Sequence, residues 1–495
     1  MENFGCRATQ ADGAAIEGQF RDRGLERATA PSQAQIVVVN TCTVTAAADQ
    51  DARATIRRIH RENPGCQILV TGCYAQRAPE ELASLPGVRW VVGNSHKHKV
   101  AEVAISRTWK SEPLDPRTNS EMRTALAPHI HKERFSAAAS AAGATNFVPL
   151  TSLMPEARSQ VFVSDIFAHT ELMAAPVFDA ANERTRPNLK VQDGCDNRCS
   201  FCVIPYVRGQ SRSLRLEEVI REVETLVASG FREVVISGIN LGRWGRDFDP
   251  PLRFEDLVWT ILEKTSLQKL RISSVEPMDW SDDLIQLIAG SPRIAKHAHL
   301  PMQSGSDRVL RRMHRKYRPW HYCEKIEKIR AAMPGAAIGA DVMVGFPSET
   351  NSEFEETRHL IEELPFTYLH VFTYSARPGT PAATMPNQVP VRVARERNRI
   401  LRELAAEKKL QFQRSFVGKT VDAITLNVFD GEHTEALTDN YLKLRLAGKH
   451  DPNHWVTAQV EHVSGGALLG TWRPQHNAPF LVHRENRIDP HFCCV

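Results

Sequence analysis

Three cysteines stand close together in the run DGCDNRCSFC, which covers residues 193–202. Cys195, Cys199 and Cys202 form a C-x3-C-x2-C array, one thiol short of the four that would hold every iron of a [4Fe–4S] cubane. Three thiolates can bind three irons and leave the fourth open, and an open coordination position distinguishes catalytic metal sites from structural ones. The alternatives are a zinc knuckle that lacks a ligand and loop cysteines with no shared role. Three thiols this close together, with one position left open, favour a catalytic iron–sulfur cluster.

A second set of three cysteines lies near the N-terminus. Cys42 and Cys73 each follow a short apolar run, 35–39 and 67–70, that predicts a strand. Loops after the carboxyl ends of parallel strands converge on one edge of a sheet, so thiols distant in sequence would meet there. Cys6 would join them, although only five residues precede it and leave room for a short first strand or none. The pattern predicts a second open cluster, and chance burial of unrelated cysteines is the alternative.

Size and composition limit the class of protein. A chain of 495 residues should form two to four domains. It has no apolar run long enough to span a membrane and no signal-peptide pattern at its N-terminus. Its ten cysteines are therefore expected to be reduced thiols used for metal binding or catalysis, in the cytoplasm. The net charge of +4 is small, so any nucleic-acid surface must be local.

The elements that must position the cysteines follow an α/β rhythm. Residues 1–103 alternate strands and helices and predict a flavodoxin-like parallel α/β domain. Residues 104–185 lose that rhythm and predict a partly disordered insertion or linker, with a small hairpin at Val161–Phe167.

From residue 186 to 412 the alternation returns and repeats six times. Six βα units predict an incomplete (β/α)6 barrel with its chemistry at the carboxyl ends of the strands, and Cys195 follows the first strand. The predicted strands are Leu189–Gln192, Glu233–Ser237, Lys269–Ser274, His297–Pro301, Ala337–Val344 and Tyr368–Tyr374. Residues 413–485 change to short strands punctuated by glycine and predict a small β-barrel, which a tail at 486–495 follows.

These motifs together resemble the radical S-adenosylmethionine (SAM) methylthiotransferase family. The resemblance spans nearly the whole chain apart from the insertion, and the terminal β-barrel looks like a TRAM domain, an RNA-binding module of this family. The motifs that carry it are GCRATQ at 5–10, NTCTVT at 40–45, TGCYAQ at 71–76, the array at 195–202, LPMQSGS at 300–306, DVMVGFP at 341–347 and YSARPGTPA at 374–382. Ser348 departs from the family, in which glycine is common at that position.

The resemblance implies two [4Fe–4S] clusters and SAM as cofactors. One cluster would be held by Cys195, Cys199 and Cys202, and the other by the N-terminal cysteines Cys6, Cys42 and Cys73. SAM bound at the first cluster would yield a 5′-deoxyadenosyl radical that removes hydrogen from C2 of an adenine, a C–H that acid–base groups alone cannot activate. The second cluster would present the methylated sulfur.

Further residues of the barrel motifs are predicted to hold SAM or to line its pocket. Core packing or satisfaction of loop hydrogen bonds is the alternative for each of them. They are Gly238, Asn240, Gln303, Ser304, Ser306, Asp341 and Gly345. The cluster at His96–Lys99 is interpreted as surface rather than metal-binding.

The implied substrate is tRNA, modified at N6-threonylcarbamoyladenosine-37 in the exposed anticodon loop, with an external electron donor. Isopentenyladenosine-37 of tRNA and a ribosomal protein remain alternative substrates, and a non-catalytic iron–sulfur RNA-binding protein is a further alternative. Basic runs at Arg392–Lys419 and Arg308–Arg318 are expected to contact RNA phosphates, with Tyr317 and Trp320 available for base stacking.

Overall fold

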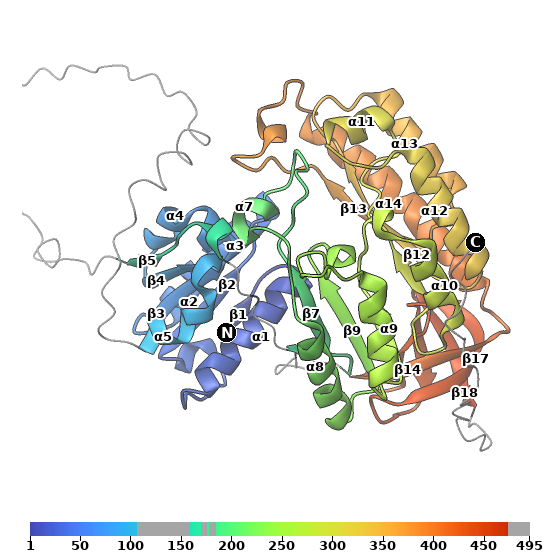
Figure 1. Ribbon diagram of the computed structural model, residues 1–495, viewed down its shortest axis with the longest axis horizontal. Coiled ribbons are helices and arrows are strands. Elements are labelled where there is room, and N and C mark those ends of the chain that lie inside the picture. Colours follow the sequence, from blue (N-terminus) through green and yellow to red (C-terminus); the bar gives the residue numbers. More distant parts are fainter. Residues whose placement is uncertain (106–158, 170–171, 173–175, 178–184, 474–495) are drawn as a thin grey trace, which may run out of the picture. The chain divides into compact units, whose positions relative to one another are not determined.

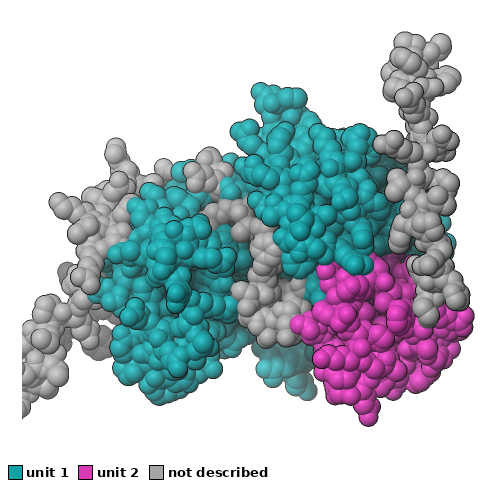
Figure 2. Space-filling model, turned by 90° about the horizontal axis from the view of Figure 1, so that it is seen from below, with its two compact units in different colours: residues 1–412 teal, residues 413–495 magenta. Residues whose placement is uncertain are grey.

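The computed structural model describes residues 1–105, 159–169, 172, 176–177 and 185–473. The chain forms two compact units, residues 1–412 and 413–495, which Figure 2 colours separately. Both cysteine sets belong to the first unit.

The N-terminal part of the first unit is a parallel sheet of five strands with helices on both faces (Figure 1). Val37 and Val39 of the second strand pack toward α2 and α4, whereas Val38 packs toward α1 and α5, because successive side chains of a strand point to opposite faces. The strands are β1 (Glu2–Asn3), β2 (Ile36–Thr41), β3 (Gln67–Gly72), β4 (Val88–Gly93) and β5 (Gln160–Phe162), and the helices are α1 (Arg7–Arg21), α2 (Ala46–Glu62), α3 (Cys73–Arg77), α4 (Pro79–Ala83) and α5 (Val100–Ile105).

The predicted parallel α/β class is confirmed, and the order of the strands adds detail to it. The order is sequential, β1-β2-β3-β4-β5. It differs from the 2-1-3-4-5 order of flavodoxin-like sheets because β1 pairs with the outer edge of β2, with Glu2 beside Val39 and Asn3 beside Asn40. A short first strand therefore precedes Cys6.

Strand β5 lies in the segment predicted to be an insertion. It pairs in parallel with β4, Trp90 beside Gln160 and Val92 beside Phe162, and Phe162 is buried in the sheet's core. The predicted hairpin at Val161–Phe167 is therefore wrong, since this stretch extends the parallel sheet instead. Residues 106–158 and 178–184 of the predicted insertion lie outside the described residues.

The second part of the first unit is the predicted open barrel of six parallel strands. Strands β7, β9 and β10 form one sheet and β11, β12 and β13 another, and a bridge between Leu270 and Ile294 joins the two. The strands are β7 (Asn188–Asp193), β9 (Glu233–Gly238), β10 (Lys269–Ile272), β11 (His297–His299), β12 (Ala337–Val344) and β13 (Tyr368–Thr373), with β6 (Pro176–Val177) and β8 (Arg212–Ser213) beside β7. The helices are α7 (Ile204–Arg208), α8 (Leu216–Ala228), α9 (Phe254–Lys264), α10 (Asp282–Gly290), α11 (Asp307–Arg312), α12 (Pro319–Ala332), α13 (Asn351–Glu363) and α14 (Val391–Arg414).

The local sequence fixes where these elements begin and which face they bury. Helix α13 begins after Thr350, whose hydroxyl accepts from the Glu353 amide while the Glu353 carboxylate accepts from the Thr350 amide. Apolar faces of the helices pack with the strands into one continuous core, which includes the buried Trp244 and Trp280. The loops that leave the carboxyl ends of the strands are thereby held on a rigid base.

The second unit contains a closed β-barrel of five strands, in the order β14-β15-β16-β18-β17. Closure leaves no free strand edge. Gly465 and Gly466 form the turn between the last two strands, with φ of +58° and +75°. The strands are β14 (Thr420–Phe429), β15 (His433–Thr438), β16 (Lys443–Ala447), β17 (Trp455–Ser464) and β18 (Ala467–Arg473). Within the described part of the chain, each helix is too short or too polar to cross a membrane.

Candidate active site

The N-terminal cysteines lie where neighbouring strands end. Cys6 precedes α1, Cys42 follows β2, and Cys73 begins α3 directly after β3. Gly5 has a φ of +97°, and a Cβ there would lie 2.7 Å from Cys42 Sγ. Gly72 has the same φ, and its Cβ would collide with the backbone of β2. A glycine before Cys6 and another before Cys73 therefore allow the loops to converge at one edge of the sheet.

The N-terminal thiols influence one another's ionisation. Burial, with smaller contributions from the thiols of Cys73 and Cys6, raises the pKa of Cys42 to about 12. Burial also raises the pKa of Cys73, against the lowering effect of the Arg208 guanidinium. Both buried thiols are protonated at neutral pH in the bare chain, so a metal centre must displace their protons when it binds.

The second set occupies the loop that follows β7. Gly194 has a φ of +72°, and any side chain there would collide with the Gln210 carbonyl oxygen. The backbone NH of Cys202 donates to the Cys199 carbonyl at 3.1 Å, which folds the array into a tight loop. Burial raises the pKa of Cys202 to about 12, with smaller contributions from the neighbouring thiols.

Two polar side chains, one after β9 and one between α11 and α12, reach the sulfur atoms of this loop. Asn240, just past β9, places Nδ2 3.6 Å from Cys195 Sγ. Arg315 donates through Nη1 to Cys199 Sγ at 3.3 Å and forms an ion pair with Glu276. Donors of this kind stabilise thiolates and orient the ligands of a cluster.

Neither cysteine set is arranged for a single metal ion. Ligands bound to one ion at 2.0–2.3 Å lie within about 4.6 Å of one another. One group of three His, Cys, Asp or Glu side chains has its ligand atoms this close together, within 4.8 Å, among residues 1–105, 185–473 and the short described pieces between them. That group contains no cysteine. Thiolates bound to separate irons of a cluster stand further apart than ligands of one ion, so this spacing is compatible with the cluster ligation that the cysteine spacing predicts.

Five charged side chains are buried together beside both cysteine sets. They are Asp12 of α1, Lys97, Lys190 and Asp193 of β7, and Arg208 of α7, each at most 2% exposed. Lys97 Nζ lies 3.0 Å from Asp12 and 3.1 Å from Asp193, and Arg208 lies 3.0 and 2.9 Å from the same two carboxylates. Lys190 also contacts both acids. This five-charge cluster joins the N-terminal sheet to the first strand of the barrel. Because Lys97 is buried in it, the prediction that Lys97 lies on the surface is wrong.

The cluster holds two acids and three bases, so its formal charge is +1. Burial alone would raise the pKa of Asp12, but the nearby Lys190, Lys97 and Arg208 outweigh it and lower the pKa to about 2. The same cations hold the pKa of Asp193 well below its usual range. Both carboxylates are therefore charged at neutral pH.

These pKa shifts predict that the folded chain loses stability in acid. Because the pKa of Asp12 is lower in the folded chain than the value near 3.9 of an unfolded one, its stabilising effect is present above about pH 4 and is lost as the pH falls toward 2. The loss should be about 2 kcal/mol of unfolding free energy for Asp12. Denaturant unfolding between pH 5 and pH 2 checks this, and the Asp12→Asn variant should show a smaller slope than the natural chain. Equal slopes would contradict the assignment.

A second buried contact joins the N-terminal part to the other end of the barrel. Arg377, in the loop after β13, is 2% exposed, donates to Thr43 Oγ1 at 2.8 Å and contacts Asp49. The Ala46 amide donates to Ser375 Oγ at 3.1 Å. The N-terminal sheet is thus bound to the barrel both at its first strand and beyond its last one.

The two cysteine sets also meet through apolar packing. Cys73 packs against Val203 and Val207, and Val203 is the residue after Cys202. Asn94 bridges the same region, because its Nδ2 lies 3.5 Å from Cys73 Sγ and 2.7 Å from the Val207 carbonyl. Helices α3 and α7, which start from the two sets, accordingly lie side by side (Figure 1).

Of the seven residues predicted to contact SAM, Asn240 has the most suitable position, because it reaches a cysteine of the array. Ser306 is fully buried, and its Oγ has no hydrogen-bond partner in the structure. Gln303 adopts a φ of +62° and forms a bridge with Val342 of β12. These three side chains lie in loops at the carboxyl ends of β9 and β11.

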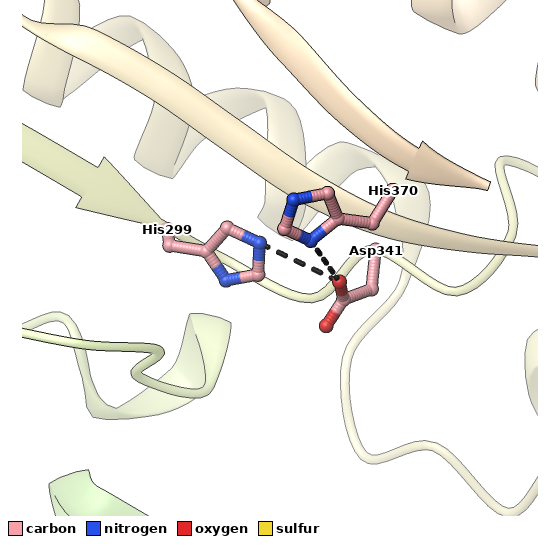
Figure 3. A group of neighbouring side chains, drawn as sticks. All are labelled: His299, Asp341 and His370. Carbon is pink, nitrogen blue, oxygen red and sulfur yellow. Dashed lines mark hydrogen bonds and ion pairs between the residues drawn. The ribbon is translucent and has the colours of Figure 1, made fainter. Parts of the chain in front are cut away.

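Three other predicted SAM contacts take part in packing or in hydrogen bonds within the protein. A Cβ on Gly238 would lie 2.9 Å from that of Gln192, so this glycine permits the close approach of β7 and β9. Ser304 Oγ lies 3.1 Å from Thr357 Oγ1, and the Gly345 amide donates to the Glu349 carboxylate at 2.7 Å. The seventh residue, Asp341, belongs to a different group of side chains, which contains His299 and His370 (Figure 3).

The structure corrects the interpretation of the basic run at Arg308–Arg318. Tyr317 is 1% exposed and donates its hydroxyl to the Pro301 and Met302 carbonyls, so it cannot stack on a base. Arg315 is buried at Cys199 rather than exposed to phosphate. The sequence offered no sign of that role, because the contact joins residues 116 positions apart.

Comparison with known proteins matches the two parts of the first unit separately. Residues 189–361 match the Radical SAM superfamily, and residues 1–93 match an uncharacterised protein family, UPF0004. A solved structure of the radical S-adenosylmethionine methyltransferase TsrM from Kitasatospora setae shares the fold, with a TM-score of 0.50 and 16% identity over 76% of this chain and 72% of that one.

Whole-length relatives are more similar in sequence. A Bacillus subtilis protein named threonylcarbamoyladenosine tRNA methylthiotransferase MtaB is 34% identical over 99% of this chain and 98% of its own. Its namesake from Aquifex aeolicus is also 34% identical, over 90% and 96%. A Streptomyces avermitilis protein named tRNA-2-methylthio-N(6)-dimethylallyladenosine synthase is 31% identical, over 99% and 86%.

Proposed function

Because the chain belongs to the radical SAM methylthiotransferase family, we propose that it replaces the C2 hydrogen of N6-threonylcarbamoyladenosine-37 in tRNA with a methylthio group. The observation that carries the choice of substrate is the 34% identity, over almost the full length of both chains, to a relative named for that nucleoside. The Streptomyces relative, named for dimethylallyladenosine and 31% identical, supports a second candidate substrate of the same reaction.

In this proposal each cysteine set holds one [4Fe–4S] cluster. Cys195, Cys199 and Cys202 hold the cluster that binds SAM, and the N-terminal set, Cys6, Cys42 and Cys73, holds the other. When bound, these groups supply the radical that removes the C2 hydrogen and the sulfur that takes its place. A protein that only bound RNA through iron–sulfur sites would not need two adjacent open sites.

The residues of the chain position these groups. Arg315 and Asn240 donate to two sulfur atoms of the first array and so orient the cysteines. The packing of Cys73 on Val203 and the five-charge cluster fix one cysteine set relative to the other, which a reaction that uses both requires. Asn240, Ser306 and Gln303 remain the predicted SAM contacts with the most suitable positions, and Gly238, Ser304 and Gly345 support the loops that carry them.

Nucleoside mass spectrometry of tRNA tests the proposal directly. In cells that lack this chain, 2-methylthio-N6-threonylcarbamoyladenosine should disappear, and it should return when the gene is restored. Loss of the 2-methylthio derivative of isopentenyladenosine instead would keep the reaction and replace the substrate. If neither nucleoside changed, a ribosomal-protein substrate would become the leading candidate.

Exposed cations on α14 are proposed to contact tRNA phosphates. Arg402 and Lys409 are exposed, whereas Arg399 is paired with Glu396 and Glu403. The double variant Arg402→Glu/Lys409→Glu should weaken tRNA binding and reduce the slope of log affinity against log salt by about 1–2. Titration of labelled tRNA at several salt concentrations measures both, and Arg399→Gln is the matched control with a smaller expected change. An unchanged slope in the double variant would remove α14 from the RNA interface.

The remaining parts of the proposal concern the terminal barrel, the electron donor and the location of the protein. The closed five-stranded barrel is proposed to be a TRAM-like RNA-binding domain, because small barrels of this kind bind RNA in the family that the chain resembles. An external donor supplies electrons to the clusters, and the cytoplasm is the proposed location, as tRNA is the substrate.

A further inference from the structure

A group of three side chains from neighbouring barrel strands contains none of the six cysteines. His299 ends β11, Asp341 lies in the middle of β12, and His370 lies in β13. Asp341 and His370 are direct neighbours in the register of β12 and β13, and His299 lies beside Gly339, two residues from Asp341. Their ligand atoms converge, as Figure 3 shows, and all lie within 4.8 Å of one another.

The distances in this group are longer than those of good hydrogen bonds. Asp341 Oδ1 lies 3.5 Å from His299 Nε2 and 3.3 Å from His370 Nδ1. Hydrogen bonds between such charged or polar groups are usually about 2.7–3.2 Å long. In a tetrahedral site with bonds of 2.0–2.1 Å, neighbouring ligand atoms stand about 3.3–3.4 Å apart. The contact with His370 is a long hydrogen bond and the contact with His299 is a long ion pair, and both distances also match those between neighbouring ligands of a shared ion.

The surroundings of His299 hold its ring in the orientation that a ligand needs. Its Nδ1 lies 2.7 Å from Ser274 Oγ, and its ring stacks on Tyr368 with centroids 5.8 Å apart. The opposite nitrogen, Nε2, is buried without a hydrogen-bond partner and faces Asp341. A metal-binding histidine is commonly fixed in this way, with its second nitrogen held by a polar group.

We propose that His299, Asp341 and His370 bind a divalent first-row metal ion. Two imidazoles and one carboxylate suit Zn²⁺ or Fe²⁺, and three protein ligands leave at least one position open to water or another small ligand. The side chain of His370 is 54% exposed, which gives an ion access to the site. This assignment replaces the predicted role of Asp341 as a SAM contact, and it does not depend on the identity of the tRNA nucleoside.

The test uses the full chain with both clusters loaded, so that the six cluster cysteines are occupied. After gel filtration with one equivalent of Zn²⁺, we expect about one zinc per chain by elemental analysis. His370→Ala should reduce zinc affinity at least tenfold, and Ser274→Ala should weaken it by about 10-fold or more through loss of the supporting hydrogen bond. His321→Gln changes an exposed histidine outside the group and should retain zinc.

X-ray absorption at the zinc edge then identifies the ligands. Nitrogen and oxygen neighbours without sulfur support the proposal. Sulfur neighbours, or equal zinc retention in the natural chain and in His370→Ala, overturn it. Because His370 is partly exposed and Ser274 is not a ligand, two independent variants keep the test valid if one of them folds poorly.

Discussion

Exchange of Cys73 for alanine is expected to leave cleavage of SAM intact and to reduce the methylthio product to background. Cys73 belongs to the N-terminal set, whereas SAM is assigned to the cluster at Cys195, Cys199 and Cys202. Loss of one ligand should prevent stable binding of the N-terminal cluster but leave the other cluster in place. Exchange of Cys199 for alanine should abolish both SAM cleavage and product formation.

Anaerobic assays that quantify 5′-deoxyadenosine and the modified nucleoside in the same sample measure this separation. Iron content should fall from about eight to about four atoms per chain in the Cys73 variant. Cys323→Ala, which changes a cysteine of α12 outside both sets, should retain both activities and all of its iron. Full product formation by the Cys73 variant would contradict the assignment of the N-terminal set.

The second large effect concerns the five-charge cluster. Exchange of Asp12 for asparagine removes one of its two acids and raises its formal charge from +1 to +2 inside the protein. Breaking a buried ion pair by removing one partner typically costs about 3–5 kcal/mol of stability. Lys97→Met removes one of the three bases and leaves two acids opposite two bases, so it should cost less than Asp12→Asn.

Urea unfolding at neutral pH compares the two variants with the natural chain. The order of the two costs is the informative result, because both variants remove one buried hydrogen-bonding charge from the same place. A greater loss for Lys97→Met than for Asp12→Asn would show that the net charge of the cluster does not control its stability.

The sequence could predict the strands and helices that alternate regularly along the chain. Each of the six barrel strands reads as a short apolar run before a helical stretch, and the structure places β7, β9, β10, β11, β12 and β13 at those runs. The cysteine sets were predictable for the same reason, since each thiol follows or begins an element at the edge where parallel strands end.

Contacts between distant segments could not be predicted. The five-charge cluster joins Asp12 to Lys190 and Arg208, which are 178 and 196 positions away, and no local pattern pairs them. A signal was nevertheless present, because Lys190 and Asp193 are charges in a strand that must be buried on both faces. The His299 group is similar, since its members are spread over three strands and become neighbours only in the barrel.

The attachment of the N-terminal sheet at both ends of the barrel also couples the positions of the two cysteine sets. To separate the N-terminal sheet from the barrel, the chain must break the ion pairs Asp12–Arg208 and Asp49–Arg377, and Arg208 also pairs with Asp193, just before the loop of Cys195. Local fluctuations that would move one cysteine set away from the other are therefore suppressed by the stability of the whole first unit. Cys6 is exposed whereas Cys42 and Cys73 are buried, so what cooperative folding fixes is the placement of one cysteine set beside the other rather than the shielding of each thiol.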